Sequence, residues 1–189
     1  MRYEKDDLEK ALACLKEGGI ILYPTDTVWG LGCNAYDEKA IEKLYELKKR
    51  SAEKSMIVLM DTETRLERSF ESIPEVAWDL IEYTEDPLTL ILDGPKAFPK
   101  NLVHADGSLA VRIVKDMFCQ HLISKLKGPI VSTSANFSGD PTPTTFAGIN
   151  PELLEMVGYI VQFKQGLTEK AKASKIIKLK NNGSVKVIR

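Results

Sequence analysis

The sequence lacks the common motifs for phosphate binding and for nucleophilic catalysis. It has no G-x-x-x-x-G-K-[ST] loop, no G-x-G-x-x-G turn and no kinase-like set of lysine, aspartate and asparagine. Its two histidines, His104 and His121, lie far apart in the sequence without a clear serine or cysteine nucleophile to activate, which argues against a histidine-based triad. Any nucleotide chemistry must therefore rely on a different set of ligands.

Long apolar runs and paired cysteines are also absent. No apolar stretch approaches the roughly 20 residues that a membrane-spanning helix needs, and residues 1–16 carry acidic side chains where a signal peptide would have an apolar core. The cysteines, Cys14, Cys33 and Cys119, are widely spaced and odd in number, which fits neither a disulfide framework nor a C-x-x-C zinc site. We therefore expect a cytoplasmic protein without a membrane partner, whose thiols are reduced and mostly buried.

The charge is nearly balanced overall but unevenly distributed. Residues 1–93 hold 12 Lys and Arg against 21 Asp and Glu, whereas residues 94–189 hold 14 against 6. The most basic stretch, residues 164–189, has eight cations and one acid. A basic surface can contact RNA, although lysines on the solvent side of terminal strands are the simpler explanation.

The pattern of apolar residues predicts one α/β domain over residues 1–189. A chain of 189 residues that is 43% apolar can bury a sizeable core. Helices are predicted at 7–17, 37–47, 74–83, 116–127 and 146–156, and strands at 20–23, 56–60, 88–92, 109–114, 129–132, 159–163, 176–179 and 185–188. This irregular order favours a single twisted, mixed β-sheet with packed helices over a regular doubly wound array.

Two long polar loops, 24–36 and 132–145, are candidates for a site, because long connections inside a compact domain are commonly functional. The run Y-P-T-D-T-V-W-G-L-G at 23–32 offers hydroxyls for a small polar ligand and glycines that allow close backbone approach. The run S-T-S-A-N-F-S-G at 132–139 follows an apolar strand and can surround phosphate oxygens with hydroxyls, an amide and backbone N–H groups. Taken alone, each segment could equally be a plain loop.

Cations follow the second predicted helix and end one predicted strand. Lys48, Arg50 and Lys54 can complement the helix dipole, but they can also bind the anionic oxygens of a triphosphate. Ser108 and Arg112 share one face of the strand at 109–114, where the guanidinium could hold a carboxylate in a cleft. The alternative for Arg112 is an ordinary position on an edge strand.

Together, the runs at 23–32 and 132–139 and the Lys-x-Arg of Lys48 and Arg50 closely resemble the YrdC-like threonylcarbamoyl-AMP synthase family. The resemblance implies a YrdC/RibB-like open sheet with a concave ligand cleft. It also implies that threonine and bicarbonate or CO2 form a carbamate that attacks the α-phosphate of ATP, with Mg2+ present. The product would pass to partner proteins that build N6-threonylcarbamoyladenosine at position 37 of tRNA.

The resemblance also assigns roles to individual residues. Those expected in catalysis are Lys48, Arg50, Ser134 and Asn136. Those expected to contact ATP are Arg50, Lys54, Ser108, Ser134, Thr142 and Arg189. Those expected to contact threonine are Thr27, Arg112, Ser132 and Ser174. The resemblance also implies that Ser134 and Asn136 serve the phosphates and the metal, while the full set of metal ligands is unknown.

The sequence departs from the family pattern after Ser174. Lys175 and Lys178 stand where the family has threonine and aspartate, so a related enzyme that uses another amine is one alternative function. A non-catalytic protein that binds structured RNA through the basic half of the chain is another.

Overall fold

The computed structural model describes residues 2–49, 56–167 and 173–189. Its helices are α1 (Lys5–Lys16), α2 (Glu38–Leu47), α3 (Glu63–Arg68), α4 (Glu75–Tyr83), α5 (Met117–Leu126) and α6 (Pro151–Glu155), with a 3-10 turn, η1, at Phe146–Gly148. Its strands are β1 (Ile21–Tyr23), β2 (Gly30–Asn34), β3 (Ile57–Met60), β4 (Leu88–Asp93), β5 (Ser108–Ile113), β6 (Ile130–Ser134), β7 (Tyr159–Ile160), β8 (Lys175–Leu179) and β9 (Val185–Val187).

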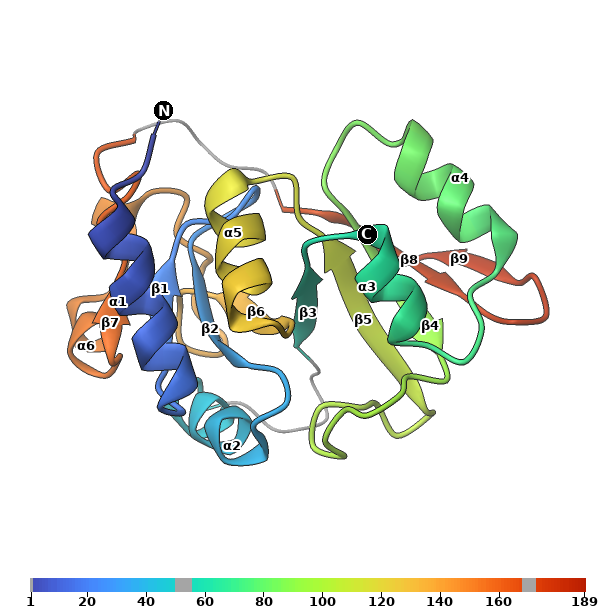
Figure 1. The fold of residues 1–189 in the computed structure, drawn as a ribbon, viewed down its shortest axis with the longest axis horizontal. Coiled ribbons are helices and arrows are strands. Elements are labelled where there is room, and N and C mark those ends of the chain that lie inside the picture. Colours follow the sequence, from blue (N-terminus) through green and yellow to red (C-terminus); the bar gives the residue numbers. More distant parts are fainter. Residues whose placement is uncertain (1, 50–55, 168–172) are drawn as a thin grey trace.

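The described strands form one mixed sheet in the order β7-β1-β2-β6-β3-β5-β4-β8-β9. Three neighbouring pairs are parallel, namely β1 with β7, β3 with β5, and β4 with β8, and the other neighbours run antiparallel. The sheet turns strongly from one end to the other (Figure 1), as the right-handed twist of strands requires. The predicted fold class, a single twisted mixed sheet with packed helices, is confirmed.

Helices cover the two faces of the sheet unequally. At the β1 end, α1 and α5 pack on one face through a cluster of buried side chains that includes Leu8, Leu15, Phe118 and Leu122. The opposite face is covered along its length by α2, α3, α4 and α6, whose apolar residues join the larger core cluster. Burial of these side chains is the main source of stability.

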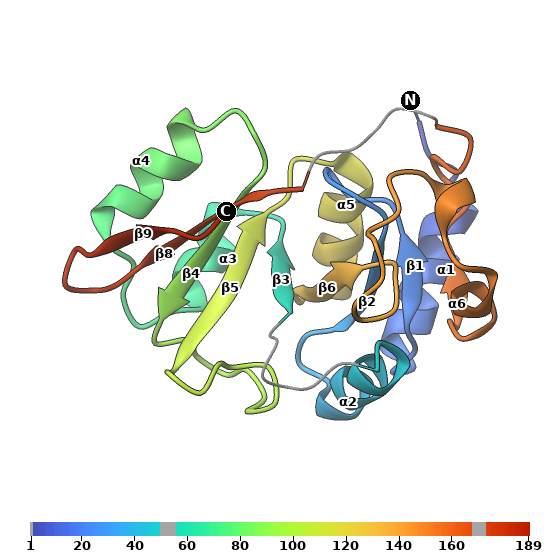
Figure 2. The ribbon, with the colours of Figure 1, turned by 180° about the vertical axis from the view of Figure 1, so that it is seen from behind.

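Over β5, β4 and β8, no helix of the described residues covers the first of these faces. Ser132, Ile57, Ala110 and Ile91 lie directly opposite one another on successive strands, so they share a face. Figure 2 shows β4, β5 and β8 in front of α3 and α4, with this face turned toward the viewer. The fold thereby leaves an open, concave surface beside the loops that follow β1 and β6.

Most predicted elements are present, but three details differ from the prediction. Strand β2 lies inside the predicted loop 24–36, and α3 was not predicted. The predicted helix 146–156 is divided into η1 and α6, because Pro151 occupies the first turn of α6 and Asn150 caps it by accepting a hydrogen bond from Glu152 N at 3.0 Å.

The cysteines are free thiols, as predicted. Cys33 and Cys119 are fully buried and Cys14 is partly buried. None of the helices in the described part of the chain combines the length and the apolar character that crossing a membrane requires.

Candidate active site

A cavity of about 280 Å³ lies on the open face of the sheet, near the roughly 300 Å³ at which small-molecule sites begin. Segments that are distant in sequence contribute to it: the turn after β1, the strands β5, β6 and β4, and the chain on both sides of the β8–β9 hairpin. Seven of the predicted site residues line it, namely Thr27, Arg112, Ser132, Ser134, Thr142, Ser174 and Arg189. These seven residues, which come from distant parts of the sequence, therefore lie around one cavity.

A tight turn after β1 brings Thr27 into this cavity. Thr25 Oγ1 donates to the carbonyl of Val28 at 2.8 Å and accepts from Thr27 N at 3.0 Å. The hydroxyls of Thr25 and Thr27 lie 2.9 Å apart, and both side chains are buried. The turn is thus held by its own hydroxyls, and these fix the direction of the Thr27 side chain.

Arg112 brings a buried positive charge to the same region. It is 5% exposed, and its Nη2 lies 3.1 Å from Oδ1 of Asp26. Its Nε is buried and has no hydrogen-bond partner among the described residues. A buried donor without a partner is costly, so this end of the cavity is suited to an acceptor such as a carboxylate.

Ser174 and Thr89 form another part of the cavity wall. Their hydroxyls are hydrogen-bonded at 2.8 Å, and both residues are almost completely buried. Arg189 closes this side, because its Nε donates to the carbonyl of Ser174 at 3.1 Å. The last strands of the sheet therefore fix two of the predicted ligand contacts relative to each other.

The loop after β6 is tied down by Lys48. The Nζ of Lys48 donates to the carbonyl of Ser134 at 2.6 Å, to Oδ1 of Asn136 at 3.1 Å and to the carbonyl of Asn136. Ser134 Oγ donates to Asn136 Oδ1 at 2.5 Å, and Asn136 Nδ2 donates to the carbonyl of Asp140 at 2.6 Å. Lys48 is 1% exposed and lies beneath the loop. Its contacts hold the loop in place, and the catalytic role expected from the sequence stays a prediction.

Ser108 is fully buried and is not among the residues that line the cavity. Its hydroxyl donates to Asp106 Oδ1 at 2.6 Å, and Lys178 donates to the other oxygen of the same carboxylate. These two hydrogen bonds hold the pKa of Asp106 well below its usual value, with the contact to Lys178 the larger cause. The nucleotide contact expected for Ser108 would require its hydroxyl to leave Asp106.

Two predicted ATP contacts, Arg50 and Lys54, lie outside the described residues. The structure therefore reports on ten of the twelve residues predicted for the site.

Buried neutral groups surround the charged pair in the cavity wall. Burial raises the pKa of the Tyr23 hydroxyl and of the Cys119 thiol well above their usual values. Cys119 Sγ donates to the carbonyl of Pro24 at 3.3 Å. These groups stay neutral at pH 7, so Arg112 and Asp26 provide the formal charge in this part of the wall.

Sequence reasoning missed Thr89 and Asp26. Thr89 stands between leucines in an apolar strand, and a buried polar residue in such a run is a usable signal because it needs a partner. Asp26 stands between the two threonines of the first motif, but only the structure shows that its carboxylate reaches Arg112 across 85 intervening positions of sequence.

Comparison with known families identifies the class to which the protein belongs. A family model for Sua5, YciO and YrdC proteins, described as "Telomere recombination", matches residues 13–189. The chain belongs to this Sua5/YciO/YrdC family. The predicted family resemblance is confirmed.

Curated relatives carry a more specific name. A protein of Xanthomonas euvesicatoria named threonylcarbamoyl-AMP synthase is 35% identical over 164 residues, which cover 85% of this chain and 87% of the relative. A protein of Pseudoalteromonas translucida with the same name is 32% identical over 161 residues, which cover 84% of this chain and 86% of the relative. The match therefore extends over most of both chains.

Solved structures show the same fold. Sua5 of P. abyssi complexed with L-threonine matches with a TM-score of 0.82 and 29% identity over 95% of this chain and 52% of that chain. This chain thus spans about half the length of that protein. E. coli YciO matches with a TM-score of 0.84 over 98% of this chain and 89% of that chain, and at 24% identity it supports the fold alone.

Proposed function

We propose that this protein forms threonylcarbamoyl-AMP and pyrophosphate from L-threonine, bicarbonate or CO2, and ATP. The observation that supports this most directly is the shared cavity. Arg112, with its unpaired buried donor, lines the same space as the Ser134 end of the loop after β6. An amino acid bound at Arg112 would lie beside phosphates bound at Ser134. The names of the curated relatives and the threonine complex of P. abyssi Sua5 support the same activity.

The amino-acid end of the cavity has the groups that threonine requires. Arg112 binds the carboxylate, while the hydroxyls of Thr27 and Ser174 and the polar wall at Ser132 face the remainder of the molecule. The side chains of Ile57, Ile91 and Ile176 supply an apolar surface in the same cavity. The site therefore pairs one charged contact with hydroxyl and apolar contacts, the combination that selects a small hydroxylated amino acid.

The reaction needs positioning more than it needs a protein nucleophile. The threonine amine adds to CO2 and loses a proton to give a carbamate, and the carbamate oxygen forms a bond to the α-phosphorus of ATP. The bond between the α-phosphorus and the bridging oxygen breaks, and pyrophosphate leaves with the electron pair. The loop held by Lys48 keeps Ser134 and Asn136 in place for the phosphates, and orienting the reactants this way is a major part of catalysis.

A magnesium ion in this site would be held mainly by the nucleotide. The described residues contain no cluster of three or more His, Cys, Asp or Glu that could hold a metal. Ser134 Oγ and Asn136 Oδ1 are oxygen atoms of the kind that Mg2+ binds, but they are hydrogen-bonded to each other, and Asn136 Oδ1 also accepts from Lys48 Nζ. They would have to exchange these hydrogen bonds to serve an ion whose shell is completed by phosphates and water. When bound, Mg2+ would neutralise phosphate charge.

The remaining assignments extend this proposal. Thr142 and Arg189 line the cavity and are proposed ATP contacts, as are Arg50, Lys54 and Ser108 from the sequence resemblance. Residues 1–189 are proposed to act as one cytoplasmic domain, with the described strands of both halves sharing one sheet. The labile product would pass to proteins that transfer the threonylcarbamoyl group to tRNA.

A pyrophosphate-release assay tests the activity. The purified protein is incubated with ATP, Mg2+, bicarbonate and L-threonine, with one component omitted in each control. We expect release that requires threonine and bicarbonate together, and an adenylate product that contains labelled threonine. Threonine-independent hydrolysis, or no turnover, contradicts the proposal. Replacing Ser134 by Ala should lower turnover, whereas replacing Ser124, on the exposed side of α5, should not.

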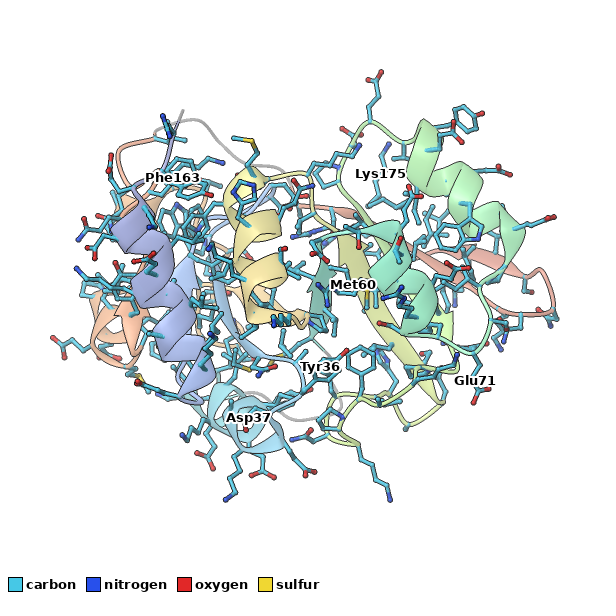
Figure 3. The ribbon with its side chains drawn as sticks, viewed as in Figure 1. Tyr36, Asp37, Met60, Glu71, Phe163 and Lys175 are labelled. Atoms are coloured by element: carbon cyan, nitrogen blue, oxygen red, sulfur yellow. The ribbon has the colours of Figure 1, made fainter. Side chains whose placement is uncertain are left out.

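The two lysines that motivated another amine substrate are engaged elsewhere. Lys175 Nζ lies 2.9 Å from Asp86, and Lys178 pairs with Asp106. Neither is among the residues that line the cavity, and Lys175 lies at the surface beside the segment after α4 (Figure 3). A panel of amino acids in the same assay decides the matter, and we expect threonine to be preferred.

A further inference from the structure

The buried ion pair in the cavity wall has a role that the motifs do not assign. We propose that Asp26 is a positioning residue, which orients the guanidinium of Arg112 so that its unpaired Nε–H receives the carboxylate of the amino-acid substrate. This inference rests on the proposed function, because it concerns the same cavity. It adds a determinant of substrate recognition that does not itself need to contact the substrate.

Asp26 holds Arg112 from one side through an ion pair. Asp26 Oδ1 lies 3.1 Å from Arg112 Nη2, and the side chains are 9% and 5% exposed. Oδ1 makes no aligned hydrogen bond among the described residues, so its hold on Arg112 is electrostatic. The second carboxylate oxygen accepts from the backbone N–H of Lys115 at 3.3 Å. Since Lys115 lies just after β5, which carries Arg112, the carboxylate is anchored to the same segment of chain that it orients.

One donor of the guanidinium has no partner among the described residues. Arg112 Nε is buried and makes no hydrogen bond there, although Arg112 lines the cavity. Nε lies on the same edge of the guanidinium as Nη2, the nitrogen that Asp26 approaches. The buried Nε–H is therefore the donor that remains for a ligand.

The position of Asp26 in the chain couples two substrate contacts. It stands between Thr25 and Thr27, whose hydroxyls lie 2.9 Å apart and hold the turn. Thr27 lines the cavity, whereas Asp26 reaches Arg112. One turn therefore sets both the hydroxyl that faces the substrate and the orientation of the group that binds its carboxylate.

The ion pair also changes how selectivity arises. Asp26 neutralises much of the positive charge of Arg112, so attraction of an anion by net charge alone is weak. Selection for a carboxylate then depends on donors held in a fixed direction, an arrangement that is sensitive to small displacements. Loss of Asp26 should therefore weaken recognition of the carboxylate more than it weakens binding of ATP.

The test compares Asp26→Asn with a matched control, Asp61→Asn. Asp61 forms an ion pair with Arg65 at 2.5 Å and is also 9% exposed, but it does not line the cavity. The protein is assayed for pyrophosphate release as a function of threonine and of ATP. L-Threoninol, which lacks the carboxylate, is tested as a competitor of threonine.

We expect Asp26→Asn to raise KM for threonine about 10- to 100-fold, the loss associated with a charge-assisted contact, while KM for ATP changes less than about 2-fold. The preference for threonine over threoninol should fall by a similar factor. Asp61→Asn should change neither value. In an Arg112→Gln background, Asp26→Asn should add less than about 2-fold, because the two residues act through one contact.

Other results overturn the inference. An active Asp26→Asn enzyme with the wild-type KM for threonine, or one whose KM rises equally in the Arg112→Gln background, removes the positioning role. If Asp26→Asn does not fold, Asp26→Glu is tested in its place. The Glu variant keeps the charge but shifts the carboxylate by one methylene. A wild-type KM for threonine in this variant would again refute the positioning role. A wild-type protein without threonine-dependent turnover refutes the proposed function instead, and the inference with it.

Discussion

Replacing Lys48 by Met tests whether this buried ammonium supports the loop after β6 or acts on the nucleotide directly. Methionine keeps most of the side-chain volume but removes every donor. The carbonyls of Ser134 and Asn136 would each lose this buried donor. At about 1–3 kcal/mol for each of the two unsatisfied carbonyls, the expected loss of unfolding free energy is about 2–6 kcal/mol. For a protein of this size, at about 2–4 °C for each kcal/mol, this lowers Tm by roughly 4–24 °C.

Thermal and urea unfolding measure this loss, and the neighbouring residue provides the control. Lys49 is exposed, with its Nζ 4.8 Å from the centre of the Phe137 ring, so Lys49→Met should cost no more than about 1 kcal/mol. Turnover of Lys48→Met should fall with its stability, because Ser134 and Asn136 lose their support. A Lys48→Met protein with the wild-type Tm and a raised KM for ATP would refute the supporting role.

Three further predictions concern packing, pH and thiol reactivity. Gly32→Ala should lower Tm by several degrees, because the new Cβ would lie 2.7 Å from Tyr23 Cε1, whereas Gly166→Ala, with no described atom within 4 Å of its Cβ, should be close to neutral. The pKa of Asp106 is lowered mainly by its hydrogen bond from Lys178, so this ion pair stabilises the fold above about pH 4. The stabilisation is lost as the pH falls through the lowered pKa of Asp106. The difference in Tm between wild type and Asp106→Asn should therefore shrink between pH 7 and about pH 2. A thiol reagent at pH 8 should leave Cys33 and Cys119 unmodified in the native protein, because burial raises the pKa of both thiols. The same reagent should modify all the cysteines in denaturant. Rapid modification of Cys33 or Cys119 in the native protein would contradict their burial.

The sequence predicted those elements whose apolar spacing is regular. Helix α1 follows Leu8, Leu12 and Leu15 and ends before Gly18, which has φ 73°, a conformation that glycine adopts without strain. The alternating face of β5 was also predictable: Leu109 and Val111 are in the core, and Arg112 faces the cavity. Periodicity carries this information because each element has one dominant buried face.

Strand β2 could not be predicted in this way. Its sequence, Gly30-Leu31-Gly32-Cys33-Asn34, has two glycines in five residues, a composition typical of a loop. The structure shows why glycine is needed: a Cβ on Gly30 or Gly32 would come within about 3 Å of the adjacent strand β6. Close packing between three strands, and not local preference, makes this segment a strand.

The site shows the same division between local and distant information. Motifs identified Thr27, Ser134 and Arg112 because their residue types suit the chemistry. The role of Lys48 depends on contacts with a loop 86 and 88 positions away in the sequence, which no local pattern encodes. The Lys-x-Arg motif predicted that Lys48 belongs to the site, and the structure shows its contacts with the loop after β6.

The location of Ser174 and Arg189 has a consequence for how the protein gains its activity. Strand β8 joins the sheet only by pairing with β4 and β9, so this wall of the cavity is assembled from the part of the chain that is synthesised late. A nascent chain would lack a competent site until this edge had docked. Substrate binding should in turn stabilise the β8–β9 hairpin in its place on the sheet. Amide hydrogen exchange should therefore slow more in this hairpin than in the distant helix α1.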